Sequence, residues 1–175
     1  SETLLQDIRL FVERQRLFGV VLPPSVSEDE AVIQLLRDLD CSYVRIASVS
    51  LDEPGAMVVT HDGLGAAEAA RYLAELGHRR IGLIAGVSTF RSSQERGAGF
   101  RKALADAGVD FDDVYFEQGA YTFESGVEAG RRLLERSPRP TAVFALNDDM
   151  AIGVMQAARE AGLEIPRDLS VVGFD

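Results

Sequence analysis

Cysteine and histidine are scarce in this chain, and their scarcity excludes several kinds of protein. The 175 residues include one cysteine, Cys41, so no disulfide can form within the chain and nothing supports export to an oxidising compartment. Cys41 has no activating sequence signature and is expected to be a core or half-buried thiol. Neither of the two histidines, His61 and His78, has a carboxylate or thiol at metal-ligand spacing, so no metal site is expected.

Long apolar runs and clusters of basic residues are also missing. No stretch approaches the ~20 apolar residues of a membrane span, and no signal-peptide pattern opens the chain, so we expect a cytoplasmic location and no membrane partner. The formal net charge is −10, and the one local basic cluster, His78-Arg79-Arg80, is too short to neutralise a nucleic-acid backbone. This segment is therefore not expected to bind DNA itself, although a tethered partner domain could do so.

The chain does contain a regular alternation of short apolar runs with helical patterns. The runs 81–85, 142–146 and 169–174 are almost continuously apolar, which is typical of strands buried on both faces of a parallel sheet. Further strands are expected at residues 18–22, 43–47, 57–59 and 114–116. The alternation predicts an α/β fold of the doubly wound type, built on parallel sheets.

Several boundaries are marked in the sequence. Ser27 followed by Glu30 fits a capping box and predicts that a helix begins there, while Gly77, Gly108 and Gly162 each follow a helical pattern and are expected at C-caps. The loop over residues 48–56 is the best candidate boundary between two lobes. The chain starts on a helical pattern and stops at the tip of a strand, so we expect a fold that is incomplete at both ends.

No converging catalytic groups are visible, and neither a catalytic residue nor a cofactor is expected. Asp148 and Asp149 are adjacent, so their side chains diverge at a helix start, where they are expected to act as a cap and as favourable charges on the helix dipole. The stretch 63–68 resembles half of a dinucleotide fingerprint. However, Glu68 stands in place of the third glycine, and a carboxylate there would repel a pyrophosphate.

Polar side chains follow the predicted strands, at the edge of the sheet where open parallel sheets bind ligands. Ser48, Ser92, Tyr121, Asn147 and Asp175 all occupy such positions. Their donors and acceptors suit a polar or polyhydroxylated ligand, although polar residues also follow strands simply because loops face water.

Four blocks of sequence then carry a resemblance to a known family. Residues 72–86, 95–100, 145–153 and 169–175 resemble, in order and spacing, the lactose-repressor (LacI/GalR) family of bacterial transcription regulators. The resemblance runs from about Phe18 to the last residue. It implies a periplasmic-binding-protein-like type I fold, in which two Rossmann-like lobes close on an effector that is commonly a sugar or sugar derivative. On this basis residues 1–60 are expected to form a partial N-terminal lobe and residues 61–175 the C-terminal lobe.

The same resemblance implies ligand-binding roles in the C-terminal lobe. Asn147 and Asp175 match family positions that bond ligand hydroxyls, and Arg96 and Ser92 match polar contacts to the same ligand. Tyr121 falls where many members place an aromatic ring that can stack on a sugar face. Alternatives remain open, because Arg96 could instead cap or pair with Glu95 or Asp175 across the loop. Tyr121 could be a surface aromatic residue, and Asn147 could be a turn residue.

Two further positions belong to the N-terminal lobe and the crossover. Thr60 falls at the lobe crossover, where an aromatic residue often lines the cleft in the family. Ser48 stands where many members carry an acidic residue, so the contact of that lobe with the ligand departs from the family pattern.

The function implied by the resemblance is effector sensing. Ligand closes the cleft, re-angles the subunits of a homodimer and alters operator binding by a helix-turn-helix expected before Ser1, and the helix around residues 150–155 is a candidate dimer surface if it does more than pack on the sheet. The alternative is a periplasmic sugar-binding protein of a transport system. A helix-turn-helix or a signal peptide before Ser1 would discriminate between them, and a sugar-processing enzyme would need an acid–base pair that the sequence lacks.

Overall fold

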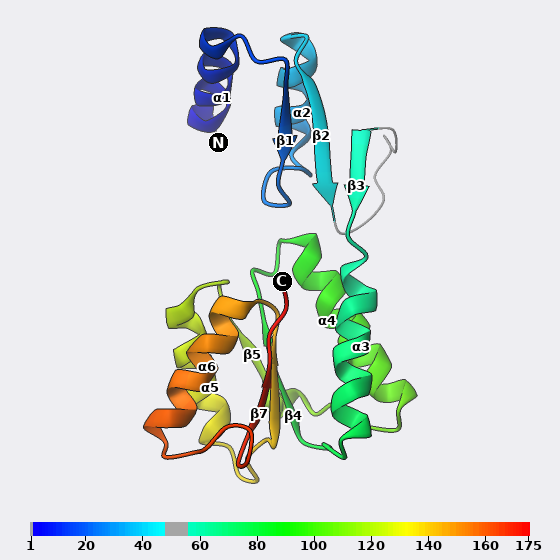
Figure 1. Ribbon diagram of the computed structural model, residues 1–175, viewed down its shortest axis with the longest axis vertical. Coiled ribbons are helices and arrows are strands. Elements are labelled where there is room, and N and C mark those ends of the chain that lie inside the picture. Colours follow the sequence, from blue (N-terminus) through cyan, green and yellow to red (C-terminus); the bar gives the residue numbers. More distant parts are fainter. Residues whose placement is uncertain (1, 48–55) are drawn as a thin grey trace. The chain divides into compact units, whose positions relative to one another are not determined.

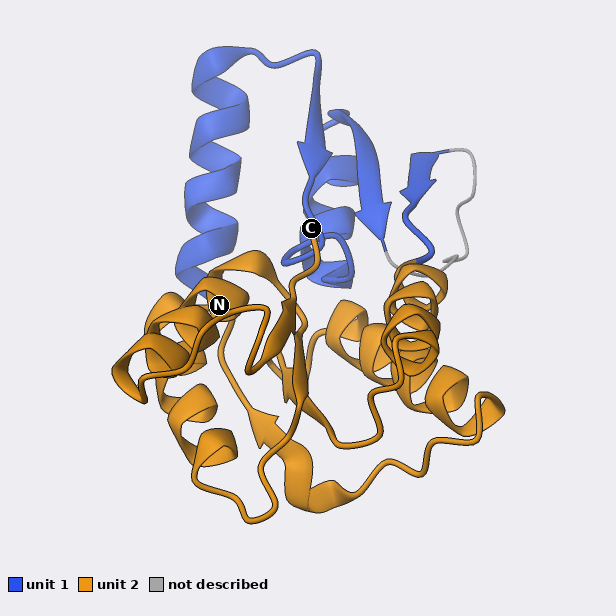
Figure 2. Cartoon of the chain, turned by 60° about the horizontal axis from the view of Figure 1, so that its bottom comes forward, with its two compact units in different colours: residues 1–61 blue, residues 62–175 orange. Residues whose placement is uncertain are grey.

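The computed structural model describes residues 2–47 and 56–175 of the chain (Figure 1). The chain divides into two compact units, Ser1–His61 and Asp62–Asp175, which Figure 2 colours separately. Each unit has its own parallel sheet and its own buried core. Every helix in the described residues is too short or too polar to cross a membrane.

Unit 1 is a small sheet with two helices. Its elements are α1 (Glu2–Gln15), β1 (Gly19–Leu22), α2 (Glu30–Asp38), β2 (Ser42–Ala47) and β3 (Met57–Val59). The strands pair in parallel in the order β1-β2-β3. Val12 of α1, Leu22 of β1 and Leu36 of α2 share one buried cluster with Cys41, so both helices pack on the same face of the sheet. The buried position of Cys41 confirms the predicted core thiol.

The start of α2 differs from the predicted capping box. Its N-cap is Asp29, whose carboxylate accepts a hydrogen bond from the backbone N–H of Ala31 at 2.9 Å. Ser27 lies two residues earlier and is fully buried, and its carbonyl oxygen accepts a hydrogen bond from Nε of Arg45 at 2.6 Å. The prediction was wrong because Asp29 is an equally good cap residue, and the turn before α2 carries Ser27 into the interior instead.

Unit 2 is a three-layer α/β structure (Figure 1). Its elements are α3 (Asp62–Glu75), β4 (Ile81–Ala85), α4 (Arg91–Asp106), the 3-10 turn η2 (Asp113–Tyr115), β5 (Phe116–Gln118), α5 (Phe123–Leu134), β6 (Ala142–Ala145), α6 (Asp148–Glu160) and β7 (Ser170–Val172). The four strands are parallel, in the order β5-β4-β6-β7. The pair α3 and α4 covers one face and the pair α5 and α6 the other. Every residue of β4 and β6 is buried, as their continuous apolar runs predict.

Two local predictions in unit 2 have different outcomes. Gly77, Gly108 and Gly162 have φ of 88°, 71° and 72°, the left-handed conformation of residues that end helices, as predicted. The strand expected at residues 114–116 is wrong, because Asp112 caps the turn η2 by accepting a hydrogen bond from Val114 N–H at 2.9 Å. The strand β5 therefore begins only at Phe116.

Close packing between α3 and α4 depends on a glycine. A Cβ atom added to Gly99 of α4 would overlap the carbonyl oxygen of Gly63 in the first turn of α3, so this approach is open only to a residue without a side chain. The approach brings the start of α3 beside the second turn of α4. As a result the carboxylate of Asp62 reaches the guanidinium of Arg96.

The strand order of unit 2 makes one edge of its sheet the expected place for a ligand. The neighbouring strands β4 and β6 are followed by helices on opposite faces, since α4 packs with α3 and α6 packs with α5. This is a topological switch point, where the loops after the two strands diverge and leave room for a ligand at the carboxyl ends of the strands. A binding site is therefore expected among the residues that follow β4 and β6.

A glycine-to-alanine substitution tests the close approach of α3 and α4. Gly99→Ala forces a methyl group against the Gly63 carbonyl, so we expect the free energy of unfolding to fall by about 1–3 kcal/mol in urea denaturation. Gly97→Ala in the same helix is the matched control, because a Cβ there meets no atom within 4 Å. That control should raise the free energy by about 0.5–1 kcal/mol through helix propensity alone, and an equal loss in both variants would contradict the packing described here.

Candidate ligand-binding site

Arg96 lies at the carboxyl edge of the unit 2 sheet and is held from three directions. Its Nε donates to Oδ2 of Asp62 at 2.7 Å, and its Nη1 donates to the carbonyl oxygen of Leu146, just after β6, at 2.6 Å. Its guanidinium carbon lies 4.1 Å from the ring centroid of Phe174, which follows β7. These contacts fix the plane of the guanidinium before any ligand arrives. They also place Arg96 beside the residues that follow β6 and β7.

Asn147 is the residue after Leu146 and has a structural role of its own. It is the N-cap of α6, and its Oδ1 accepts a hydrogen bond from Met150 N–H at 3.0 Å. Its Nδ2 donates to the carbonyl oxygen of Tyr121 at 3.2 Å. The amide therefore ties the loop after β5 to the start of α6. Asp148 and Asp149 occupy the first turn of α6, where the helix dipole favours negative charge.

Tyr121 has an unusual backbone conformation and a ring that packs against Gly86 and Phe90. Its φ of 62° is left-handed, which is uncommon for a residue with a side chain. The ring packs directly on Gly86, where an added Cβ would overlap it, and stacks on Phe90 with centroids 6.0 Å apart. Its hydroxyl oxygen is buried and has no hydrogen-bond partner in the described part of the chain. An aromatic face and an unused hydroxyl thus stand at the carboxyl end of β4.

The remaining two predicted residues of unit 2 lie at the same edge. Ser92 is half-buried in the first turn of α4, one helical turn before Arg96, and therefore shares its face of the helix. Asp175 is exposed and follows β7 directly after Phe174. The structure thus gathers Ser92, Arg96, Tyr121, Asn147 and Asp175 on the loops and helix starts that follow the strands of a single sheet.

The other two predicted residues are not brought into this group. Thr60 belongs to unit 1, where its hydroxyl donates to the carbonyl oxygen of Ala47 at 3.3 Å, an arrangement that extends the pairing of β2 and β3. Ser48 lies outside the described residues. Ligand contacts by Thr60 and Ser48 therefore stay predictions.

Sequence reasoning missed three contributors to the edge. Asp62 is 3% exposed and is the ion-pair partner of Arg96, whereas the sequence suggested Glu95 or Asp175 for that role. Phe90 and Phe174 supply the rings beside Tyr121 and Arg96. The available signal for Asp62 was modest, namely an acidic residue at the first position of a helix that follows a strand closely.

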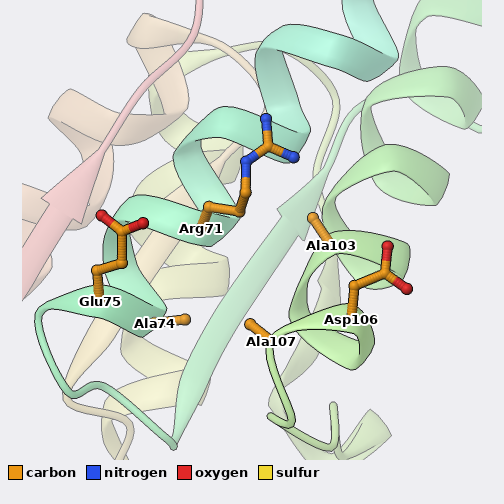
Figure 3. Close-up of a pocket in the computed structure, with 6 residues that line it drawn as sticks. All are labelled: Arg71, Ala74, Glu75, Ala103, Asp106 and Ala107. Carbon is orange, nitrogen blue, oxygen red and sulfur yellow. The ribbon is translucent and has the colours of Figure 1, made fainter.

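The described residues also form a hollow and a histidine contact that lie away from the Arg96 edge. A hollow between α3 and α4 is lined by Arg71, Ala74, Glu75, Ala103, Asp106 and Ala107 (Figure 3). It reaches the last residues of both helices, so it extends toward the end of the sheet opposite Arg96. At that end His78 Nδ1 lies 2.8 Å from Oγ1 of Thr141, and burial lowers the pKa of His78. No group of three potential metal ligands occurs among the described residues.

Comparison with known proteins agrees with this architecture. The fold of unit 2 is that of a binding-protein-like domain, since a family model described as a periplasmic binding protein-like domain matches residues 70–175. The probable HTH-type transcriptional repressor ExuR of Bacillus subtilis is 37% identical over 164 residues, which are 94% of this chain and 49% of that protein. The chain belongs to the LacI family of this class, as its sequence blocks predict.

Solved structures of relatives match the fold closely. A regulatory protein of the LacI family from Chloroflexus aggregans is 36% identical with a TM-score of 0.85, over 100% of this chain and 63% of that one. The transcriptional regulator CelR, solved in complex with cellobiose, is 33% identical with a TM-score of 0.85, over 99% of this chain and 53% of that one. The chain spans about half the length of the curated relatives it matches. The named relatives are transcription regulators, neither enzymes nor transport proteins.

A pair of substitutions at Asn147 tests its structural role. Asn147→Ala removes both the cap of α6 and the bond to the Tyr121 carbonyl, so we expect the free energy of unfolding of the ligand-free protein to fall by about 2 kcal/mol. Asn147→Ser keeps an oxygen that can cap α6 but loses the amide donor. Its expected loss is about 1 kcal/mol, measured by chemical denaturation. If serine costs as much as alanine, Asn147 does not stabilise the protein as an N-cap.

Proposed function

We propose that this chain is the effector-sensing part of a cytoplasmic transcription regulator, and that its effector is a sugar or sugar derivative. Unit 1 corresponds to the N-terminal lobe of an effector-binding domain and unit 2 to the C-terminal lobe. Binding of the sugar changes the affinity of the complete protein for operator DNA, which a helix-turn-helix outside this chain contacts. Such regulation requires the sugar to bind one state of the protein more tightly than the other.

The observation that carries this proposal is the preorganised Arg96 at the carboxyl edge of unit 2. A guanidinium held by Asp62, Leu146 and Phe174 keeps one orientation, so little freedom is lost when it donates to ligand hydroxyls. Asn147 and Asp175 add polar groups at the same edge, and Tyr121 adds an aromatic face for the C–H side of a sugar ring. This combination suits a polyhydroxylated ligand better than a flat or wholly apolar one.

The comparisons support a regulator over the other candidates. The named relatives regulate transcription by their printed descriptions, and CelR was solved with a sugar, cellobiose. Neither observation favours a transport protein. An enzyme would need a converging acid and base, whereas Asp148 and Asp149 are adjacent residues in the first turn of α6.

The face formed by α5 and α6 is the proposed surface for a second copy of the chain. Ile152 and Met155 of α6 and Phe123 of α5 are 54%, 43% and 40% exposed, although all three are large apolar residues. A groove between the two helices adjoins them and is lined partly by Phe123 and Val127. Apolar side chains grouped on one face are typical of interface cores, and pairing of two copies would give the paired DNA-reading heads that a two-fold operator needs.

Sugar binding can be tested in the complete protein. A thermal-shift screen against mono- and disaccharides, cellobiose included, should find a sugar that raises the melting temperature, because ligand at about 100 times its Kd stabilises the native state by about 2.7 kcal/mol. In a gel-shift assay the same sugar should change the fraction of operator DNA retained. Arg96→Lys keeps the positive charge but loses the planar guanidinium and its fixed N–H donors, so it should weaken sugar affinity about tenfold or more.

The control for Arg96→Lys is Arg71→Lys, which makes the same change on an exposed part of α3. It should leave both the sugar affinity and the gel shift unchanged. If no sugar shifts the melting temperature and DNA retention never responds, the proposed function is wrong. If Arg96→Lys binds the sugar as tightly as the parent protein, the site assignment is wrong although sugar sensing stands.

The dimer face can be tested by introducing a charge. Ile152→Asp places a carboxylate at the centre of the apolar group on α6, so we expect dimer affinity to fall at least about tenfold in sedimentation velocity. Leu76→Asp is the matched control, because Leu76 is 57% exposed and follows α3 on the other helical layer. A complete protein that stays dimeric with Ile152→Asp, or that dissociates equally with Leu76→Asp, would refute this interface.

A further inference from the structure

The charge of Arg96 is already balanced inside unit 2. The Asp62 side chain is 4% exposed and that of Arg96 is 16% exposed, with Nε and Oδ2 2.7 Å apart. Opposite charges at this distance, with little water around them, cancel most of each other's electric field at the carboxyl edge of the sheet. The guanidinium therefore presents its remaining N–H groups to a ligand as hydrogen-bond donors rather than as an unpaired positive charge.

The surroundings of this pair carry more carboxylates than cations. Asp148 and Asp149 stand in the first turn of α6, Asp175 follows β7, and the Glu95 side chain lies beside Gly63 in the first turn of α3. Arg91, at the start of α4, is the additional cation that the described part of unit 2 places at this edge. Among the unit 2 side chains at this edge, an anionic ligand approaching Arg96 would therefore meet more carboxylates than cations.

A carboxylate or phosphate that binds the outer N–H groups of Arg96 while Asp62 keeps Nε meets a guanidinium whose charge is already balanced, and it adds a second negative charge to the site. Displacing Asp62 instead would leave a buried carboxylate without its cation, which is strongly unfavourable. A hydroxyl group behaves differently, because it accepts a hydrogen bond from the outer N–H groups of Arg96 without adding a charge beside Asp62. A hydroxyl can also donate to a carboxylate, and Asp175 is an exposed carboxylate at the same edge.

We propose that Asp62 is the residue that sets the charge specificity of this site, so that unit 2 binds an uncharged polyhydroxylated ligand and discriminates against sugar acids and sugar phosphates. This inference rests on the proposed function, since it concerns the effector of the same site. Asp62 acts through Arg96 and is therefore a positioning residue. It neutralises the guanidinium from the side opposite the ligand.

The test compares matched neutral and acidic sugars by isothermal titration calorimetry on the complete protein. Suitable pairs are glucose and glucuronate, galactose and galacturonate, ribose and ribose 5-phosphate, and cellobiose and its uronic-acid analogue. In each pair with measurable binding, the neutral member should bind the parent protein at least about tenfold more tightly. Asp62→Asn retains an oxygen for Arg96 Nε but removes the compensating charge, so the ratio of the two affinities should fall about tenfold or more.

Two variants control for fold and net charge. Asp62→Glu restores the carboxylate and should recover much of the preference for neutral sugars, which a purely structural role for residue 62 would not predict. Asp106→Asn removes one exposed carboxylate from the far end of α4, and the affinity ratio should stay that of the parent protein. Circular dichroism of Asp62→Asn establishes that it is folded, and the parent protein's own preference tests the proposal if it is not.

Each outcome separates this inference from the function on which it rests. Equal or tighter binding of the acidic sugars by the parent protein would overturn the charge specificity while leaving sugar sensing intact. An unchanged ratio in folded Asp62→Asn would overturn the role of Asp62. Failure of the parent protein to bind any sugar of either charge, with no response in DNA retention, would instead remove the proposed function.

Discussion

The ion pair between Arg96 and Asp62 is the interaction on which the ligand-facing edge of unit 2 depends. Both side chains have lost most of their hydration, so each requires the other as a partner, and removal of either would leave an uncompensated charge. Asp62 begins α3 and Arg96 lies in the second turn of α4. The ion pair therefore holds the N-terminal ends of the two helices together at the carboxyl edge of the sheet. The Leu146 carbonyl and the Phe174 ring extend the same assembly to β6 and β7.

The residues proposed to bind ligand also stabilise the ligand-free protein. Asn147 caps α6 and holds the loop that carries Tyr121, so its amide is oriented before a ligand arrives. Tyr121 in turn keeps a left-handed backbone while its ring packs on Gly86. A site built in this way loses little entropy on binding, because its side chains are already fixed. The cost is that each such substitution changes stability as well as affinity, which is why paired variants are needed to separate the two effects.

Much of unit 2 could be predicted from local patterns, because the strands β4 and β6 are short apolar runs and the helices α3, α4 and α6 end at glycines with positive φ. The errors arose where two local signals competed. Ser27 and Asp29 are both good cap residues, and only the burial of Ser27 beside Arg45 decides between them. The run before β5 has strand-like residues, but the Asp112 cap gives η2 instead. Packing or a single hydrogen bond decided each case.

Some residues of the candidate site could also be predicted from the sequence, whereas others depend on contacts between helices that are far apart in the chain. The family resemblance of two sequence blocks identified Arg96 and Asn147, and the topology places both beyond the carboxyl ends of β4 and β6. The partner of Arg96 could not be identified so, since Asp62 reaches it only through the close approach of α3 and α4 at Gly99. A motif that contains an arginine therefore does not establish that its site is positively charged. The residue that begins the preceding helix decides whether that arginine meets its ligand as a cation or as an already neutralised donor.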